Sequence, residues 1–192
     1  ENGRLTVRRF TLAPDGTTTL AATRDLGLAS GSVAGISVSG GRVILAGETR
    51  NGDLDVAHKT NAHAGGVDAF VIALEADLAA SADDRLTYVG GAGDDSAADV
   101  KVHDGKAWLT GVADRPADAK ETDPTRAYLS RIDPLTGTVE WSRTWDGDGG
   151  QARTATLAIT TGGASVLDRL GLPQGEIEQS SSKTLVDATA LR

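Results

Sequence analysis

Two stretches of the sequence share one pattern: residues 36–47 read ISVSGGRVILAG, and residues 100–111 read VKVHDGKAWLTG. An ungapped shift from position 36 to position 100 places apolar residues over apolar residues and glycine over glycine. Apolar and polar residues that alternate on both sides of a glycine-containing turn are typical of a β-hairpin. Each stretch is therefore predicted to form two antiparallel strands, with Gly40-Gly41 and Asp104-Gly105 supplying the positive φ angles of the turns.

A third copy of this pattern lies near the end of the chain. Residues 157–168 read LAITTGGASVLD and keep both the alternation and the turn. Asp168 stands where the other copies have Gly47 and Gly111. Internal similarity at a fixed spacing predicts a repeat architecture, in which neighbouring units bury one another's faces.

Strand signals upstream of each copy complete units of four short strands. Residues 9–16 (RFTLAPDG) correspond to residues 130–137 (SRIDPLTG). The predicted strands are 4–12, 17–25, 33–38 and 42–48 in the first unit, 68–75, 85–90, 97–102 and 106–112 in the second, and 127–132, 138–145, 153–160 and 164–169 in the third. Four meandering strands per repeat are typical of β-propeller blades.

The fold prediction is all-β, with three tandem four-stranded antiparallel blade-like units in a partial or open β-propeller and a β-sandwich as the alternative. The expected organisation is blade-like repeats at 1–50, 68–112 and 126–170, linker loops at 51–67 and 113–125, and a tail or linker to a missing domain at 171–192. Three blades do not close a ring of the usual four to eight. The ring would be completed by chain outside this sequence or by a second chain, or it would stay open. Because the sequence contains no methionine, it is expected to be a piece of a larger assembly.

Composition excludes several classes of function. The net charge is −8, and the basic residues form no run longer than a pair such as Arg8-Arg9, so a nucleic-acid partner is not expected. The absence of cysteine removes disulfides and thiol chemistry. No apolar run approaches the roughly 20 residues of a membrane helix, so membrane insertion is not expected either.

The second unit carries a family resemblance. Residues 88–102 read YVGGAGDDSAADVKV and are followed by Asp104-Gly105 and by WLTG at 108–111. This stretch resembles the bacterial SBBP-type β-propeller repeat, and the resemblance extends over roughly residues 20–170 with decreasing quality. It implies a non-catalytic scaffold of an exported bacterial surface or appendage assembly, extracellular or at the cell surface. Similar repeats in alphaproteobacterial flagellar proteins imply a flagellar-type assembly, with other subunits or domains of the same larger chain as partners.

Four aspartates are candidate calcium ligands. Residues 90–97 (GGAGDDSA) fit the Gly-Gly-x-Gly-x-Asp-x-apolar calcium repeat, which contributes Asp94 and Asp95. Asp146 and Asp148 alternate with glycine, as carboxylates do in calcium loops. The alternative is that these side chains accept hydrogen bonds from backbone amides in turns. Calcium is the one cofactor that the sequence suggests.

No arrangement of residues predicts an enzyme. The histidines His58, His63 and His103 have no zinc-site spacing and are expected to be exposed, and no nucleophile-elbow sequence is present. The alternative function is a glycan-binding or glycan-processing propeller. It would need carboxylates such as Glu140 or Asp99 to meet across a funnel, whereas strand alternation predicts that both face solvent.

The tryptophans are expected to fill the cores of the blades or the edges of strands. Stacking against sugars is the alternative. Basic residues along the strands are expected to lie on solvated faces. The tryptophans are Trp108, Trp141 and Trp145, and the basic residues are Arg8, Arg9, Arg131 and Arg143.

Overall fold

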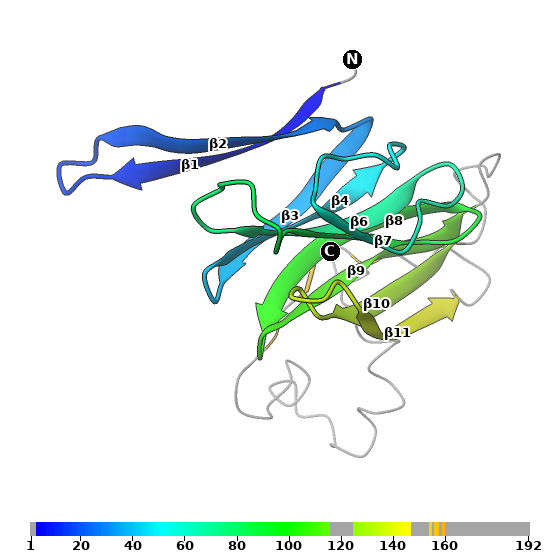
Figure 1. Ribbon diagram of the computed structural model, residues 1–192. Helices are drawn as coiled ribbons and strands as arrows, with labels where there is room; N and C mark the ends of the chain where they lie inside the picture. Colours follow the sequence, from blue (N-terminus) through cyan, green and yellow to red (C-terminus); the bar gives the residue numbers. More distant parts are fainter. Residues whose placement is uncertain (1–2, 116–124, 147–153, 155, 158, 160–192) are drawn as a thin grey trace, which may run out of the picture.

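The computed structural model describes residues 3–115, 125–146, 154, 156, 157 and 159, and every regular element among them is a β-strand (Figure 1). The all-β prediction is confirmed. The strands are β1 (Arg4–Leu12), β2 (Thr18–Leu28), β3 (Gly31–Ser39), β4 (Arg42–Thr49), β5 (His58–Thr60), β6 (Asp68–Glu75), β7 (Arg85–Val89), β8 (Asp94–His103), β9 (Lys106–Arg115), β10 (Arg126–Ile132) and β11 (Val139–Asp146). All except β5 correspond to a predicted strand. The predicted strand at 164–169, and half of the residues of that at 153–160, lie outside the described residues.

These strands form three layers, which Figure 1 shows one below another. β1 and β2 form a two-stranded hairpin that projects to the left of the view. The first sheet has five strands in the order β3-β4-β6-β7-β5, and the second sheet has four in the order β8-β9-β10-β11. Every pairing is antiparallel except that of β5 with β7, which is parallel.

The grouping of strands into sheets differs from the predicted units. β1 to β4 were expected to share one sheet, but β3 and β4 form a sheet with β6 and β7 from the next predicted unit. β4 pairs with β6 from Arg42↔Glu75 to Thr49↔Asp68. Both strands are buried along nearly their whole length, so each needs a strand on either side and cover on both faces. Each sheet therefore combines the last two strands of one predicted unit with the first two of the next.

Glycine permits the close approach of strands at matching positions in the two sheets. Gly47 faces Phe70 across the first sheet, and Gly111 faces Tyr128 across the second. A Cβ atom at either glycine would lie 2.8 Å from the facing ring and well inside contact distance of a carbonyl oxygen, that of Ser32 or Ser96. The predicted positive φ values of the turns are also confirmed: they are 58° and 76° at Gly40-Gly41, and 49° and 70° at Asp104-Gly105.

Two hydrophobic cores separate the three layers. Side chains of β4 alternate between them, since Val43 and Leu45 join the first core and Ile44 and Ala46 join the second. The first core lies between the hairpin and the first sheet, and its largest members include Leu26, Leu54, Phe70, Ile72, Leu74, Leu86 and Tyr88. The second core lies between the two sheets and includes Val71, Val100, Leu109, Tyr128 and Ile132.

The segment 51–67 is more than the polar linker that was expected. Leu54 is 0% exposed and Val56 is 6% exposed, and both belong to the first core. β5 lies in the same segment and adds a parallel edge strand to the first sheet. β5 could not be predicted from the sequence, because a strand of three residues is too short to show alternation.

Residues at aligned positions of the repeats make contacts between layers on β3 and β8, which are edge strands of their sheets. A Cβ atom at Gly35 of β3 would lie 3.2 Å from the Val100 backbone nitrogen on β8. Asp99 occupies the aligned position on β8, and its carboxylate accepts a hydrogen bond of 2.9 Å from the Leu157 backbone amide. Leu157 is the residue that aligns with Val100 in the sequence repeat. Leu157 therefore contacts Asp99 of β8, and Val100 of β8, which aligns with Leu157, lies close to Gly35 of β3, which aligns with Asp99.

Candidate interaction site

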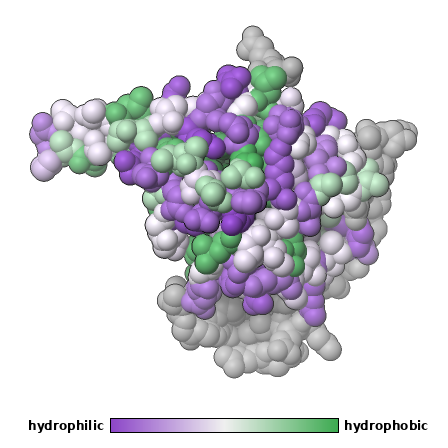
Figure 2. All heavy atoms as spheres, viewed as in Figure 1, coloured by the Kyte–Doolittle hydropathy of each residue, from purple (hydrophilic) through white to green (hydrophobic). Residues whose placement is uncertain are grey.

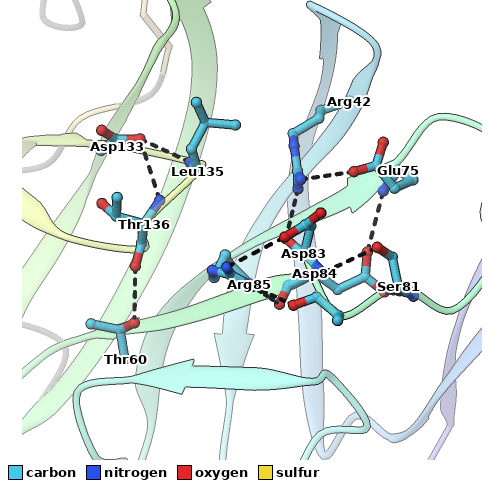
Figure 3. Close-up of polar contacts among 11 residues, drawn as sticks. Arg42, Thr60, Glu75, Ser81, Asp83, Asp84, Arg85, Asp133, Leu135 and Thr136 are labelled. Atoms are coloured by element: carbon cyan, nitrogen blue, oxygen red, sulfur yellow. Dashed lines mark hydrogen bonds and ion pairs between the residues drawn. The ribbon is translucent and has the colours of Figure 1, made fainter.

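A buried polar network joins the far ends of strands in the first sheet (Figure 3). The Arg42 guanidinium donates to Glu75 Oε1 at 2.8 Å and to the Asp83 carbonyl at 3.0 Å. The Asp84 carboxylate is fully buried and accepts hydrogen bonds from the Glu75 and Ser81 backbone amides. These groups fix the loop between β6 and β7, so the network is structural.

The same carboxylate attaches the hairpin to the first sheet. Arg24 of β2 places its guanidinium 3.7 Å from Asp84 Oδ2, and both side chains are largely buried. Arg9 of β1 donates to the Ala76 carbonyl in the same loop. The hairpin is therefore held by two arginines in addition to the apolar side chains of the first core.

A second polar cluster, the carboxylate corner, consists of Asp68 and Asp95 beside Gly90 and of Asp94 beside Gly66. The carboxylates accept hydrogen bonds from backbone amides: Asp68 from Ala64, Asp94 from Val67, and Asp95 from Gly91, at 2.5, 2.9 and 2.9 Å. A Cβ atom at Gly90 would lie 2.7 Å from both Asp68 and Asp95. Burial raises the pKa of Asp68 above its usual value, against the lowering effects of the Ala64 amide and His63. Asp68 was not singled out in the sequence.

Three of the four candidate calcium ligands are described, and they lie at two separate places. Asp94 and Asp95 cap turns at the start of β8, whereas Asp146 ends β11 and pairs with Arg126 at 2.9 Å. β8 and β11 are the two outer strands of the second sheet, about 14 Å apart at a strand spacing near 4.8 Å. Asp148 lies outside the described residues. Within the described part of the chain, no group of three or more His, Asp or Glu side chains is arranged to hold a metal ion.

The expectation of exposed histidines is wrong for His63. Its side chain is only 15% exposed and packs edge-on against the Tyr88 ring, with 5.4 Å between ring centroids. Its Nε2 atom lies 3.1 Å from the Thr49 carbonyl, and its Nδ1 atom lies 3.8 Å from Asp68. Burial raises the pKa of Tyr88 to about 12. His58 is exposed as expected, and His103 is partly buried beside its turn.

The tryptophans occupy the outer face and edge of the second sheet and are absent from both described cores. The Trp108 and Trp141 ring centroids are 6.1 Å apart. Arg131 lies over Trp108 at 5.7 Å, and Arg143 lies over Trp141 at 5.9 Å. Aromatic residues and arginine are enriched at protein-binding surfaces, and a guanidinium over an aromatic ring makes a favourable cation–π contact. We call these four residues the Trp-Arg patch.

Neither carboxylate proposed for the glycan alternative is available to a funnel. Glu140 is bound by Lys106 at 2.5 Å and by Arg131 at 3.0 Å. Asp99 is 8% exposed, not solvent-facing as expected, and accepts from Lys101 and from the Val100 and Leu157 amides. Burial alone would raise the pKa of Asp99, but these donors and the Thr156 hydroxyl together lower it below the usual value.

Large apolar side chains are exposed on the hairpin and on β3. Figure 2 shows apolar residues scattered over the projecting hairpin among polar ones. On β3, Ile36 is 57% exposed and Val38 is 68% exposed. The other exposed apolar residues of these strands are Phe10, Leu12, Leu20, Leu28 and Val33. Exposed apolar side chains therefore lie on three successive strands, β1, β2 and β3.

A small cavity of about 300 Å³ opens beside the second core. Its lining includes Asn61, Asp95, Tyr128 and Ser142. The Tyr128 hydroxyl is buried without a hydrogen-bond partner among the described residues, and burial raises the pKa of Tyr128 well above its usual value. This volume is at the lower limit for a small-molecule pocket.

Among the described residues, no helix is long and apolar enough to cross a membrane.

Comparisons with known proteins identify an informative relative. No protein-family model matches the chain. The chain is 40% identical over 178 residues to "Regulatory protein FlaEY" of Caulobacter vibrioides; the match covers 92% of this chain and 19% of that protein. The chain spans about a fifth of the relative's length and, over most of its own length, is similar to part of a regulatory protein.

Proposed function

We propose that this chain is a non-enzymatic protein-interaction module that acts in the regulation of a bacterial flagellar-type assembly. The observation that carries the proposal is the 40% identity to "Regulatory protein FlaEY", and the flagellar-type assembly is what the repeat resemblance implies. The partly exposed Trp-Arg patch and the exposed apolar side chains of β3 supply surfaces that a protein partner could cover. Regulation is favoured over a purely structural role because the relative is named as regulatory.

The absence of enzymatic activity is part of this proposal. Two buried carboxylates with shifted pKa values have structural partners. Asp99 accepts hydrogen bonds from the Thr156 hydroxyl and the Leu157 amide, and Asp68 accepts one from the Ala64 amide. A general acid or base needs a free position beside a substrate and a pKa matched to its task. The described residues offer no such group next to a nucleophile.

We also propose that the layers are blades of an SBBP-type propeller. The aligned contacts of Gly35 with Val100 and of Asp99 with Leu157 support this arrangement, because successive blades of a propeller meet at their innermost strands. The cross-strand pairing of glycine with an aromatic residue also recurs, as Gly47 with Phe70 and as Gly111 with Tyr128. Location at the cell surface or outside the cell follows from the resemblance and is proposed with it.

A segment exchange tests the regulatory role. The aligned segment of FlaEY in Caulobacter vibrioides would be replaced by this chain, and swimming motility and flagellin level would be measured. We expect the exchange to preserve both, whereas deletion of the segment should reduce them. An exchange carrying Gly111→Ala, which disturbs the second sheet, should behave like the deletion, and Gly3→Ala, at an open position, should behave like the exchange. Normal motility after deletion would refute the proposal.

A glycan-binding role is the second candidate, supported by the Trp108–Trp141 pair, in which Trp141 is exposed and Trp108 is half-buried. Aromatic faces of this kind stack on sugar rings. Titration with bacterial surface polysaccharides should then change tryptophan fluorescence, and Trp141→Ala should abolish the change while leaving the fold intact. No response to any glycan would remove this candidate.

A further inference from the structure

The cavity of about 300 Å³ beside the second core is lined by residues of both sheets. The members of its lining that matter here are Val89, Gly90, Asp95, Tyr128 and Ser142. Ser142 lies between Trp141 and Arg143 along β11, and successive side chains of a strand point to opposite faces. The cavity is therefore separate from the Trp-Arg patch. Its volume is sufficient for a ligand of several non-hydrogen atoms.

The Tyr128 hydroxyl is a buried polar group without a hydrogen-bond partner among the described residues. Tyr128 is 2% exposed, and a buried hydroxyl that makes no hydrogen bond is costly. The other hydroxyl and amide side chains of the lining already have partners: Ser142 bonds Ser130, Thr144 bonds Arg126, and Asn61 bonds the Tyr88 carbonyl. Tyr128 thus supplies a hydroxyl that is free to bind a ligand in this cavity.

Two buried carboxylates meet at the Gly90 end of the cavity. A Cβ atom at Gly90 would lie 2.7 Å from Asp68 Oδ1 and 2.7 Å from Asp95 Oδ2, so glycine keeps the space beside both oxygens open. Asp68 Oδ1 is buried and accepts no hydrogen bond from the described residues, whereas His63 lies 3.8 Å from the other oxygen, Oδ2. A buried charged oxygen without a donor is strongly unfavourable. This end of the cavity therefore favours a positively charged donor.

Electrostatics link the hydroxyl to these carboxylates. The negative charges of Asp95 and Glu48 add to the effect of burial and raise the pKa of Tyr128 further. The hydroxyl therefore lies within electrostatic reach of Asp95, and it stays protonated at neutral pH. A neutral hydroxyl keeps its oxygen lone pairs for a donor on the ligand.

The charge of the lining selects the class of ligand. Asp95 lines the cavity, and none of the described residues that line it is lysine, arginine or histidine. An anionic ligand would have no counter-charge there. A primary ammonium group carries one positive charge and three N–H donors, which match carboxylate and hydroxyl oxygens. The apolar part of the lining, formed by Val89, Ala113 and Val139, suits a short alkyl chain.

We propose that this cavity binds a primary ammonium group on a short alkyl chain. Asp95 supplies the counter-charge, the Tyr128 hydroxyl accepts a hydrogen bond, and Asp68 adds a second negative charge beside Gly90. The ammonium group belongs either to a free amine or to a lysine side chain of another protein, because the two share this chemistry. The proposal goes beyond the regulatory role and depends neither on that role nor on the blade-like stacking.

A chemical-shift titration of the ¹⁵N-labelled chain with n-butylammonium chloride tests the binding. We expect saturable shifts at the backbone amides of Gly90, Gly91 and Asp95. Tetramethylammonium chloride at equal ionic strength has the charge without N–H donors, and n-butanol has the alkyl chain without the charge, so neither should produce these shifts. No saturable shift with n-butylammonium, or equal shifts with either control, would overturn the proposal. Saturable shifts with calcium chloride but not with n-butylammonium would also overturn it, in favour of a metal ion.

A blocked lysine distinguishes the two sources of the ammonium group. Nα-acetyl-lysine amide presents the same group at the end of a lysine side chain. Tighter binding than that of n-butylammonium would assign the cavity to a protein partner, and weaker binding would assign it to a free amine. Either result supports recognition of the ammonium group, whereas failure of both probes overturns it.

Two substitutions test the residues that the proposal names. Tyr128→Phe should weaken n-butylammonium binding about fivefold through loss of one hydrogen bond, and Asp95→Asn should weaken it at least tenfold through loss of the counter-charge. Tyr128→Phe removes only a hydroxyl without a described partner, so it should fold and keep the test valid if Asp95→Asn does not. Tyr88→Phe is the matched control and should leave the affinity unchanged, because the Tyr88 hydroxyl binds the Asn51 carbonyl. Unchanged affinity in Tyr128→Phe would overturn the proposed site.

Discussion

Replacing Gly111 by alanine tests the close strand approach that recurs in both sheets. The new Cβ atom would overlap the Ser96 carbonyl oxygen and lie 2.8 Å from Cε1 of Tyr128. The backbone of β8 cannot rotate away as a flexible side chain could, so β8 and β9 must separate. Overpacking of a tight site typically costs about 1–3 kcal/mol, and a weakened ladder hydrogen bond adds roughly 1 kcal/mol.

We therefore expect Gly111→Ala to lower the free energy of unfolding by about 3 kcal/mol. For a chain of this size, such a loss lowers Tm by roughly 6–12 °C. Urea unfolding followed by tryptophan fluorescence measures the free energy, and calorimetry measures Tm. Gly3→Ala is the control, because a Cβ atom at Gly3 meets nothing within 4 Å, and its effect should stay within about 0.5 kcal/mol. If Gly111→Ala were as neutral as Gly3→Ala, the described contact between β8 and β9 would be wrong.

Three other substitutions have expected outcomes that the same unfolding measurements can check. Val100→Ala should lower the free energy of unfolding by about 2 kcal/mol, since it removes two buried methyl groups and leaves a cavity. Ile36→Ala should lower it by less than about 0.5 kcal/mol in the monomer, and equal losses would contradict the burial pattern. Tyr128→Phe should raise the free energy of unfolding by about 1 kcal/mol, because the buried Tyr128 hydroxyl has no described hydrogen-bond partner. Tyr88→Phe should lower it by a similar amount, because the Tyr88 hydroxyl donates to the Asn51 carbonyl at 2.9 Å, and effects of the same sign would contradict this difference. Asp99→Asn should destabilise the chain at pH 7, and the stability difference between the two proteins should disappear as pH falls through the lowered folded pKa of Asp99, because the carboxylate contributes stability only while ionised. A stability difference that persists in acid would exclude this origin.

Local alternation and turn chemistry were sufficient to predict most strands. Residues 4–12 and 68–75 form strands with the predicted bounds, and the turn at Gly40-Gly41 has the predicted backbone conformation. These features depend on neighbours in the sequence. The pairing of β4 with β6 does not, because a long segment separates them and no turn signal marks the pair.

The chemistry of the candidate sites was less predictable for the same reason. Strand alternation places Asp99 on the solvent side, and His63 lies in a predicted loop, yet contacts from distant segments bury both. Trp108 alternates with apolar neighbours, but the side facing the second core is taken by Ala107 and Leu109. Leu54 and Val56 are isolated apolar residues, and only the position of the hairpin shows what they pack against. A signal that could have marked Asp99 is its alignment with Gly35, a position where the backbone of another layer approaches closely.

The offset between predicted units and observed sheets has a consequence for synthesis on the ribosome. Within each sheet, apart from the short edge strand β5, neighbouring strands follow one another along the chain. The first sheet can thus assemble once residue 89 has emerged from the exit tunnel, and the second once residue 146 has emerged. The apolar side chains of the hairpin would stay uncovered until the first sheet has formed. A nascent chain paused after residue 50, at the end of a predicted unit, would hold β4 without β6 and expose its most apolar strand to chaperones.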